Sequence, residues 1–207
     1  MPLPDTLSGR AYLALYDRDR GRLTSRGFRT QLLAGAALAD LYLGGHVVDE
    51  GGRVATAGRN QPTEPVQAEL WRRIDESRPR RWQHWAAQRG LEAVIRDELS
   101  TRWIRIDRPP RFLRRARVSL RDPRAHTQLR TVIDGTLRGP MPIGRMPEQD
   151  TMLVALLAVA EVRPLITRQR KREYKRRIDE AIARGGAPID GVRRAVRQAR
   201  QAQTGGG

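Results

Sequence analysis

The side chains with the clearest chemical potential in this sequence are its arginines. The chain carries 40 Lys+Arg against 23 Asp+Glu, a formal net charge of +17, and only Lys171 and Lys175 of the basic residues are lysines. A guanidinium group forms paired hydrogen bonds to phosphate, whereas an ammonium group acts as a point charge. The alternative explanation of the preference for arginine is codon bias in a GC-rich genome, which we favour for most of these residues but which does not explain where they cluster.

Most of the surplus charge lies in two segments. Residues 102–124 hold 9 basic and 2 acidic side chains, and residues 161–207 hold 13 basic and 5 acidic ones. The rest of the chain is nearly neutral. The sign of the charge therefore indicates an anionic partner, and its clustering indicates that particular surfaces meet that partner.

The residue types of catalytic and metal sites are not arranged here as such sites require. The chain has no cysteine, which excludes disulfides, thiolate metal sites and cysteine nucleophiles. His46, His84 and His126 are far apart and form neither HExxH nor HxH. The sequence also lacks GxxxxGK[ST], GxGxxG and GxSxG. We therefore predict a binding protein that is not an enzyme and has no cofactor and no metal.

The longest uninterrupted apolar run covers residues 152–160, nine residues. A helix that spans a bilayer needs about 20. Residues 1–5 contain neither the basic nor the apolar segment of a secretion signal. We expect a cytoplasmic protein whose contact with membranes, if it has one, is peripheral.

The hydrophobic pattern predicts a chain that is mainly helical. A short apolar segment at 7–16 is followed by expected helices at about 28–43, 65–77, 82–101, 126–137, 150–163, 168–184 and 189–201. We expect Thr63 to cap the second of these helices, and Asp150 or Thr151 to cap the 150–163 helix. Residues 152–162 are apolar on all sides and should form the central buried helix.

Two short β-hairpins are expected between the helices. The first pairs residues 46–48 with 53–56 across Asp-Glu-Gly-Gly, and the second pairs 103–106 with 116–120. The fold class that follows is mainly α. It is a single compact helical domain over residues 1–207, with two short β-hairpins, a central apolar helix, an ordered core at about 7–202 and a flexible tail at 203–207.

The connection of the second hairpin combines apolar and basic residues. Phe112 and Leu113 lie at its expected tip, with Arg111, Arg114 and Arg115 around them. Apolar side chains that insert between cations hold an anionic lipid surface, and each basic residue adds about 1 kcal/mol. We predict that this hairpin docks on membranes. The alternative is a solvated hairpin whose two apolar residues pack on the domain.

Two other kinds of partner stay open. Helix followed by hairpin occurs twice, which is the order of a winged-helix DNA-binding module. Nucleic acid is the less favoured partner, because the 28–43 helix is too apolar to present polar side chains to base edges. The third alternative is a protein partner bound by the amphipathic 168–184 helix.

Several segments follow one another in a distinctive order. They are YLALYDRDRGRL at 12–23, LAGAALADLYLGGHVVDE at 33–50, the break at 62–63, WQHW at 82–85, a helix that leads into a basic hairpin, and MLVALLAVA at 152–160. In order and spacing the sequence resembles the Golgi phosphoprotein 3 family over about residues 7–202. Its arginine usage and short ends look like the bacterial members.

The resemblance implies a mostly helical domain with a basic face that docks on membranes. Eukaryotic members of the family recognise phosphatidylinositol 4-phosphate and act as adaptors for the cytosolic tails of glycosyltransferases. Self-association in the family uses the basic hairpin, which implies homo-oligomers through residues 103–120 here.

The resemblance also implies a headgroup site near the start of the first core helix. The family's tryptophan and arginine there fall on Ser25 and Ala34 in this sequence, and Arg89 lies one place from one of two further basic positions. Arg26, Arg29 and Arg89 are therefore the expected headgroup-binding residues. Since two family positions differ, we expect binding to the surface of an anionic phospholipid membrane and leave the headgroup open.

Overall fold

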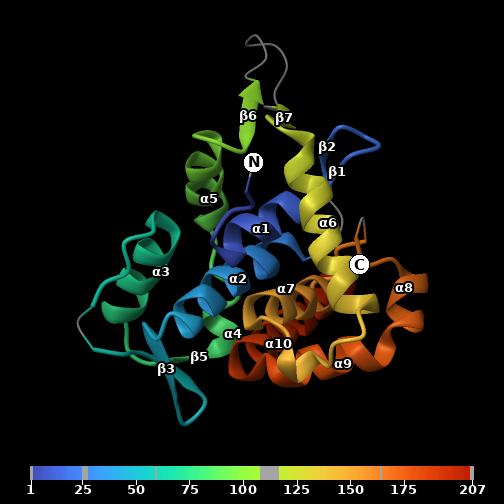
Figure 1. Cartoon of the computed structure of the whole chain (residues 1–207). Helices are drawn as coiled ribbons and strands as arrows, with labels where there is room; N and C mark the ends of the chain where they lie inside the picture. The colour runs from blue at the N-terminus through green and yellow to red at the C-terminus, as the bar shows by residue number, and fades with distance from the viewer. Residues whose placement is uncertain (1, 25–27, 59, 108–116, 164, 206–207) are drawn as a thin grey trace.

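The computed structural model describes residues 2–24, 28–58, 60–107, 117–163 and 165–205. The α-helices of these residues are Leu7–Ala14 (α1), Arg29–Leu43 (α2), Pro65–Asp75 (α3), Trp82–Trp85 (α4), Leu91–Ser100 (α5), Pro123–Arg138 (α6), Glu148–Val159 (α7), Arg168–Glu173 (α8), Lys175–Arg184 (α9) and Gly186–Thr204 (α10). The strands are Tyr16–Asp17 (β1), Arg22–Leu23 (β2), Val47–Glu50 (β3), Arg53–Thr56 (β4), Arg80–Arg81 (β5), Ile104–Asp107 (β6) and Arg117–Leu120 (β7). The fold is mainly α, as predicted (Figure 1).

The apolar helix α7 lies at the centre of the fold. Its residues from Thr151 to Ala158 are all buried, and α1, α2, α6, α9 and α10 pack around it (Figure 1). A helix that is apolar all round has no side suited to water, so it is stable only when neighbours cover it completely. The prediction of a central apolar helix is confirmed.

The second buried helix, α2, approaches α10 very closely. Its residues from Leu32 to Leu41 are buried. A Cβ on Gly35 would lie 2.2 Å from the Cγ2 methyl of Val192 on α10. Because α2 is covered by the core, it cannot enter a DNA groove as a recognition helix.

The β-structure consists of short antiparallel pairs at the edges of the helical body. Both predicted hairpins are present, with Val47 opposite Thr56 in the first and Ile104 opposite Leu120 in the second. The structure adds a small β1–β2 pair and places β5 beside β4. In Figure 1 the β6–β7 pair lies at the top of the molecule, far from the β3–β4 hairpin.

Two helices expected to be continuous are broken. The 82–101 segment forms α4, which ends at Trp85, and α5, which begins after Gly90; Gly90 has a φ of 89°, a left-handed conformation that a continuous helix does not contain. The 168–184 segment forms α8 and α9, with Tyr174 (φ −104°, ψ 23°) between them. No glycine or proline marks this second break in the sequence.

The predicted helix caps are also wrong in detail. Glu64 precedes α3, which begins at Pro65, a residue whose fixed φ suits the first helical position. Pro147 precedes α7, so Asp150 lies inside its first turn, where it pairs with Arg10 at 3.2 Å. Near the carboxyl end of the chain, α10 continues to Thr204, which is two residues into the expected tail at 203–207.

The apolar stripe of the 168–184 segment is directed at the core. Ile178 is buried, and Tyr174 and Ile182 pack partly buried against the core residues. A protein partner at this segment would therefore meet the basic residues of α8 and α9 instead of an apolar face. Among the described helices, each is too short or too polar to cross a lipid bilayer.

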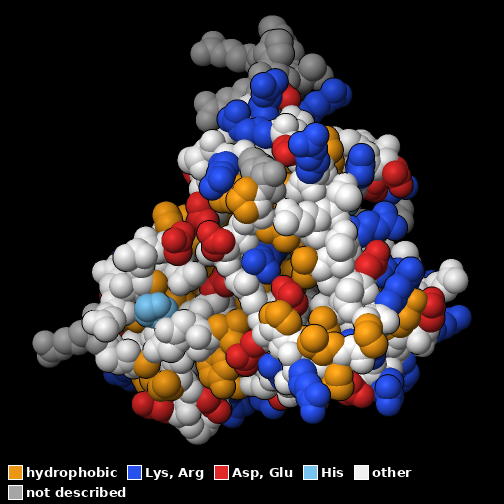
Figure 2. Space-filling view, viewed as in Figure 1, with side chains coloured by type: hydrophobic (Ala, Val, Ile, Leu, Met, Phe, Trp, Pro, Cys, Tyr) orange, Lys and Arg blue, Asp and Glu red, His pale blue; other side chains and the backbone are white. Residues whose placement is uncertain are grey.

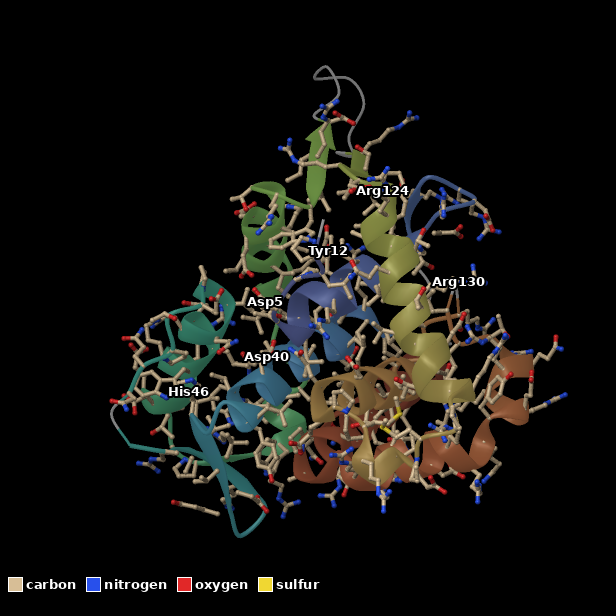
Figure 3. All side chains as sticks on the ribbon, in the orientation of Figure 1. Asp5, Tyr12, Asp40, His46, Arg124 and Arg130 are labelled. Carbon is tan, nitrogen blue, oxygen red and sulfur yellow. The ribbon has the colours of Figure 1, made fainter. Side chains whose placement is uncertain are left out.

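A buried carboxylate joins α1 to α2. Asp40 of α2 accepts hydrogen bonds from the backbone N–H groups of Leu7 (2.7 Å) and Ser8 (3.0 Å), at the start of α1 (Figure 3). Burial nevertheless raises the pKa of Asp40 to about 6. Burial also raises the pKa of Glu98 on α5 to about 7, and the negative charges of Glu64 and Asp40 add to the shift.

These two carboxyls predict a fold that is less stable at higher pH. In the unfolded chain they titrate at about pH 4, so the folded state binds their protons more tightly. Their contribution to stability is full below about pH 4 and is lost as the pH rises through about 6 to 7.

The substitution Glu98→Gln tests this pH dependence. We expect it to raise the free energy of unfolding by on the order of 1 kcal/mol at about pH 8, because it removes a carboxylate that burial and like charges disfavour. At about pH 5, where Glu98 is already protonated, we expect little change. Urea unfolding at both pH values measures it, with the exposed neighbour Asp97→Asn as control. An equal gain at both values would contradict the account.

Candidate anion-binding site

A cavity of about 360 Å³ lies where the start of α2, the turn before α5 and the end of α10 meet. Its lining residues are Phe28, Arg29, Thr30, Gln31, Arg89, Ala199, Ala202 and Gln203. Two of the three predicted headgroup residues, Arg29 and Arg89, line this one cavity although they belong to different elements. Arg26 lies outside the described residues, as do Arg111, Phe112, Leu113, Arg114 and Arg115 of the predicted docking hairpin.

The start of α2 supplies backbone donors to the cavity. Phe28 has no side-chain hydrogen bond that caps the helix, and its own N–H donates to the carbonyl oxygen of Ala160 (3.2 Å), which fixes α2 against the end of α7. The N–H groups of residues 29–31 have no partner inside the helix, and they carry its positive dipole end. This geometry suits the binding of phosphate or another anion.

The Arg29 guanidinium is held by two neighbours. It donates a hydrogen bond to Glu92 on α5, and it lies over the ring of Tyr12, 5.9 Å from the ring centroid. The Arg29 side chain is 26% exposed, and its Nε is buried with no hydrogen-bond partner among the described residues. Arg29 therefore has a fixed position in the cavity wall.

The Tyr12 ring, which lies beneath the Arg29 guanidinium, carries no charge. Burial raises the pKa of its hydroxyl to about 12, and the positive charge of Arg29 acts against that rise. The phenol stays protonated at neutral pH, so the group beneath Arg29 is a neutral ring and adds no negative charge to the cavity.

Arg89 supplies a second, more exposed cation. Its carbonyl oxygen accepts a hydrogen bond from Arg73 Nη1 (2.9 Å), and Gly90 turns the chain directly after it. The backbone is fixed in this way, while the side chain is exposed and forms no ion pair within the described part of the chain. The Arg89 guanidinium can therefore contact an anion that enters the cavity.

The end of α10 forms a wall that the sequence did not predict. Arg200 lies over the Phe28 ring, 5.5 Å from its centroid, and pairs with Glu161 at 2.5 Å. Phe28 also supplies an aromatic residue at the start of α2, where the sequence comparison found Ser25 in place of the family's tryptophan. In the sequence, the position of Phe28 directly before the helix could have identified it as this aromatic residue. The contribution of α10 depends on packing between distant segments, which no local pattern reveals.

The comparison with known families agrees with this architecture. A sequence model of the family described as Golgi phosphoprotein 3 (GPP34) matches residues 7–203. The chain belongs to the Golgi phosphoprotein 3 family. The match begins at Leu7, the first residue of α1, and ends at Gln203 of α10. It therefore includes the start of α2, the turn before α5 and the end of α10, which together form the cavity. No curated protein sequence matches the chain.

The rest of the described surface offers no comparable metal or acid–base site. Within those residues, no three His, Asp or Glu side chains gather as metal ligands. Burial lowers the pKa of His84 and of His126, which leaves both neutral at physiological pH. The arginines around the α2 cavity are therefore the strongest candidates for ligand contact.

Proposed function

We propose that this protein is a peripherally membrane-associated protein that binds an anionic phospholipid headgroup in the α2 cavity. The observation that carries the proposal is the convergence of Arg29 and Arg89 on one cavity at the start of α2. Arginine side chains and a helix N-terminus together form a favourable site for a phosphate group. Phosphatidylinositol 4-phosphate, the lipid that eukaryotic family members recognise, is one candidate headgroup.

The basic hairpin supports contact with a membrane beyond the headgroup itself. Figure 2 shows basic side chains around the upper end of the molecule, where β6 and β7 lie. Arg105 of β6 and Arg117 of β7 are exposed there. We propose that the hairpin adds electrostatic attraction and that Phe112 and Leu113 insert. Self-association through residues 103–120 stays a prediction.

Family membership supports an adaptor function without catalysis, which we adopt as part of the proposal. A protein partner at residues 168–184 would meet a basic surface. Nucleic acid is disfavoured because α2, the helix before the first hairpin, is buried and cannot present its side chains to base edges.

Vesicle flotation tests the proposal. We expect the protein to float with vesicles that contain a phosphoinositide or another anionic phospholipid and to stay behind with neutral phosphatidylcholine vesicles, because the positive charge at the α2 cavity attracts only an anionic headgroup. Binding should weaken as salt is added, since exposed charges are screened. Equal binding to neutral vesicles, or binding to neither, would contradict it, and steep binding to duplex DNA would favour the nucleic-acid alternative.

A further inference from the structure

A second and smaller cavity lies at the end of α7. Its volume is about 120 Å³, and its lining residues are Ala158, Glu161, Arg163, Ile166, Arg168 and Lys171. This volume corresponds to about four water molecules, which is enough for one tetrahedral oxyanion. None of these residues lines the α2 cavity.

The rim of this second cavity carries a local excess of positive charge. Arg163, Arg168 and Lys171 are exposed, and within the described residues none of the three pairs with a carboxylate. Lys171 Nζ donates a hydrogen bond to the carbonyl oxygen of Ala158 (3.3 Å), which holds the ammonium at the cavity. Glu161 lines the cavity as well, but its carboxylate accepts a hydrogen bond from Arg200, so its charge is compensated.

The backbone at the end of α7 brings these cations together. Glu161 has a φ of 58°, a left-handed conformation that more often belongs to glycine at this place after a helix. The turn is closed by a hydrogen bond from the Val162 N–H to the carbonyl oxygen of Leu157 (3.0 Å). The chain therefore reverses, and Arg163 comes to the same cavity as the first residues of α8 and the last turn of α7.

The floor of the cavity is apolar. Ile166 and Ala158 are both buried. A charged ligand that rests on an apolar floor is shielded from water on one side, which strengthens its attraction to the cations on the rim. The combination differs from a solvated row of arginines on an exposed helix, where each charge faces water.

We propose that this second cavity binds a phosphate monoester group, held by Arg163, Arg168 and Lys171. The site is separate from the α2 cavity and does not depend on the proposed function. The phosphate comes either from a membrane lipid or from a soluble phosphate ester, and both sources present the same dianionic oxygens to the three cations.

Inorganic phosphate is the probe for this site. We expect phosphate to raise the melting temperature of the full-length protein more than chloride does at equal ionic strength, because a ligand that binds only the folded state stabilises it. The double variant Arg168→Gln/Lys171→Gln should show a clearly smaller rise, because only the α2 cavity and the general salt effect of phosphate then contribute. The matched control Arg172→Gln, an exposed arginine of α8 outside the cavity lining, should keep it.

The variant Arg89→Gln separates this proposal from the proposed function. The phosphate-dependent rise should persist in Arg89→Gln, which alters only the α2 cavity. An equal reduction of the rise in Arg172→Gln, or an undiminished rise in the double variant, would overturn the proposal. Vesicles that contain phosphatidic acid then identify the source: weaker vesicle binding of the double variant indicates a lipid, and unchanged vesicle binding indicates a soluble ester.

Discussion

Replacing Arg29 and Arg89 together by glutamine is expected to lower the affinity of the protein for anionic vesicles by on the order of 100-fold. A hydrogen bond to a charged group contributes about 1.5–3 kcal/mol, and about 1.4 kcal/mol corresponds to a factor of ten in affinity. Both arginines line the α2 cavity, so both contacts are lost together. Co-sedimentation with vesicles over a range of lipid concentrations measures the change.

Single variants and a matched control make this result specific. Arg89→Gln should lower affinity by about tenfold without changing the melting temperature, because its side chain makes no contact that the fold needs. Arg29→Gln also leaves Glu92 without its partner, so its stability must be measured beside its binding. Arg197→Gln removes the same charge from an exposed position of α10 outside the cavity lining. An equal loss in Arg197→Gln would contradict a defined site.

The substitution Gly191→Ala is expected to destabilise the fold by about 3 kcal/mol. A Cβ at this position would lie 2.6 Å from the Cβ of Trp82 and 2.9 Å from its carbonyl carbon, where α10 crosses α4. The second of these atoms is backbone, so the contact cannot be relieved by rotating a side chain, and the helices must separate. Urea unfolding measures the loss, and a midpoint unchanged from the wild type would contradict the close crossing.

Two other glycines serve as controls for this crossing. Gly135→Ala on α6 has open space around the new Cβ, so it should leave stability unchanged or raise it by up to about 1 kcal/mol. Gly35→Ala would place its Cβ against the Cγ2 methyl of Val192, which is a side chain. The double variant Gly35→Ala/Val192→Ala should therefore recover part of the stability lost in Gly35→Ala alone.

The parts of the fold that follow from local pattern were predictable. The 28–43 helix and the apolar 152–160 segment are recognised by their periodicity and composition, and the two hairpins by their turn residues. The break at Tyr174 and the β5 strand were not predicted, since both depend on contacts between distant segments; the local β1–β2 pair, with two residues in each strand, was also missed. Arg170 of α8, for example, pairs with Asp134 of α6, a contact between distant segments that has no local signal.

The candidate site also has a part that was predictable from the sequence and a part that was not. Arg29 and Arg89 were expected from the resemblance to the family, which places charge near the start of the first core helix and before the basic hairpin. The wall made by Ala199, Ala202 and Gln203 was not expected, because the sequence indicated that the chain becomes a flexible tail at residue 203. That α10 continues to Thr204 and closes the cavity is a result of packing against α2, α4 and α7.

The most direct test of the account is a titration of the isotope-labelled protein with a soluble inositol phosphate, followed by the backbone amide signals. The account predicts that the amides of Thr30 and Gln31 shift as they donate to the phosphate, and that Arg89→Gln strongly weakens the response. If these amides stay unmoved while the protein still binds anionic vesicles, the headgroup does not bind at the start of α2, and the central claim is wrong.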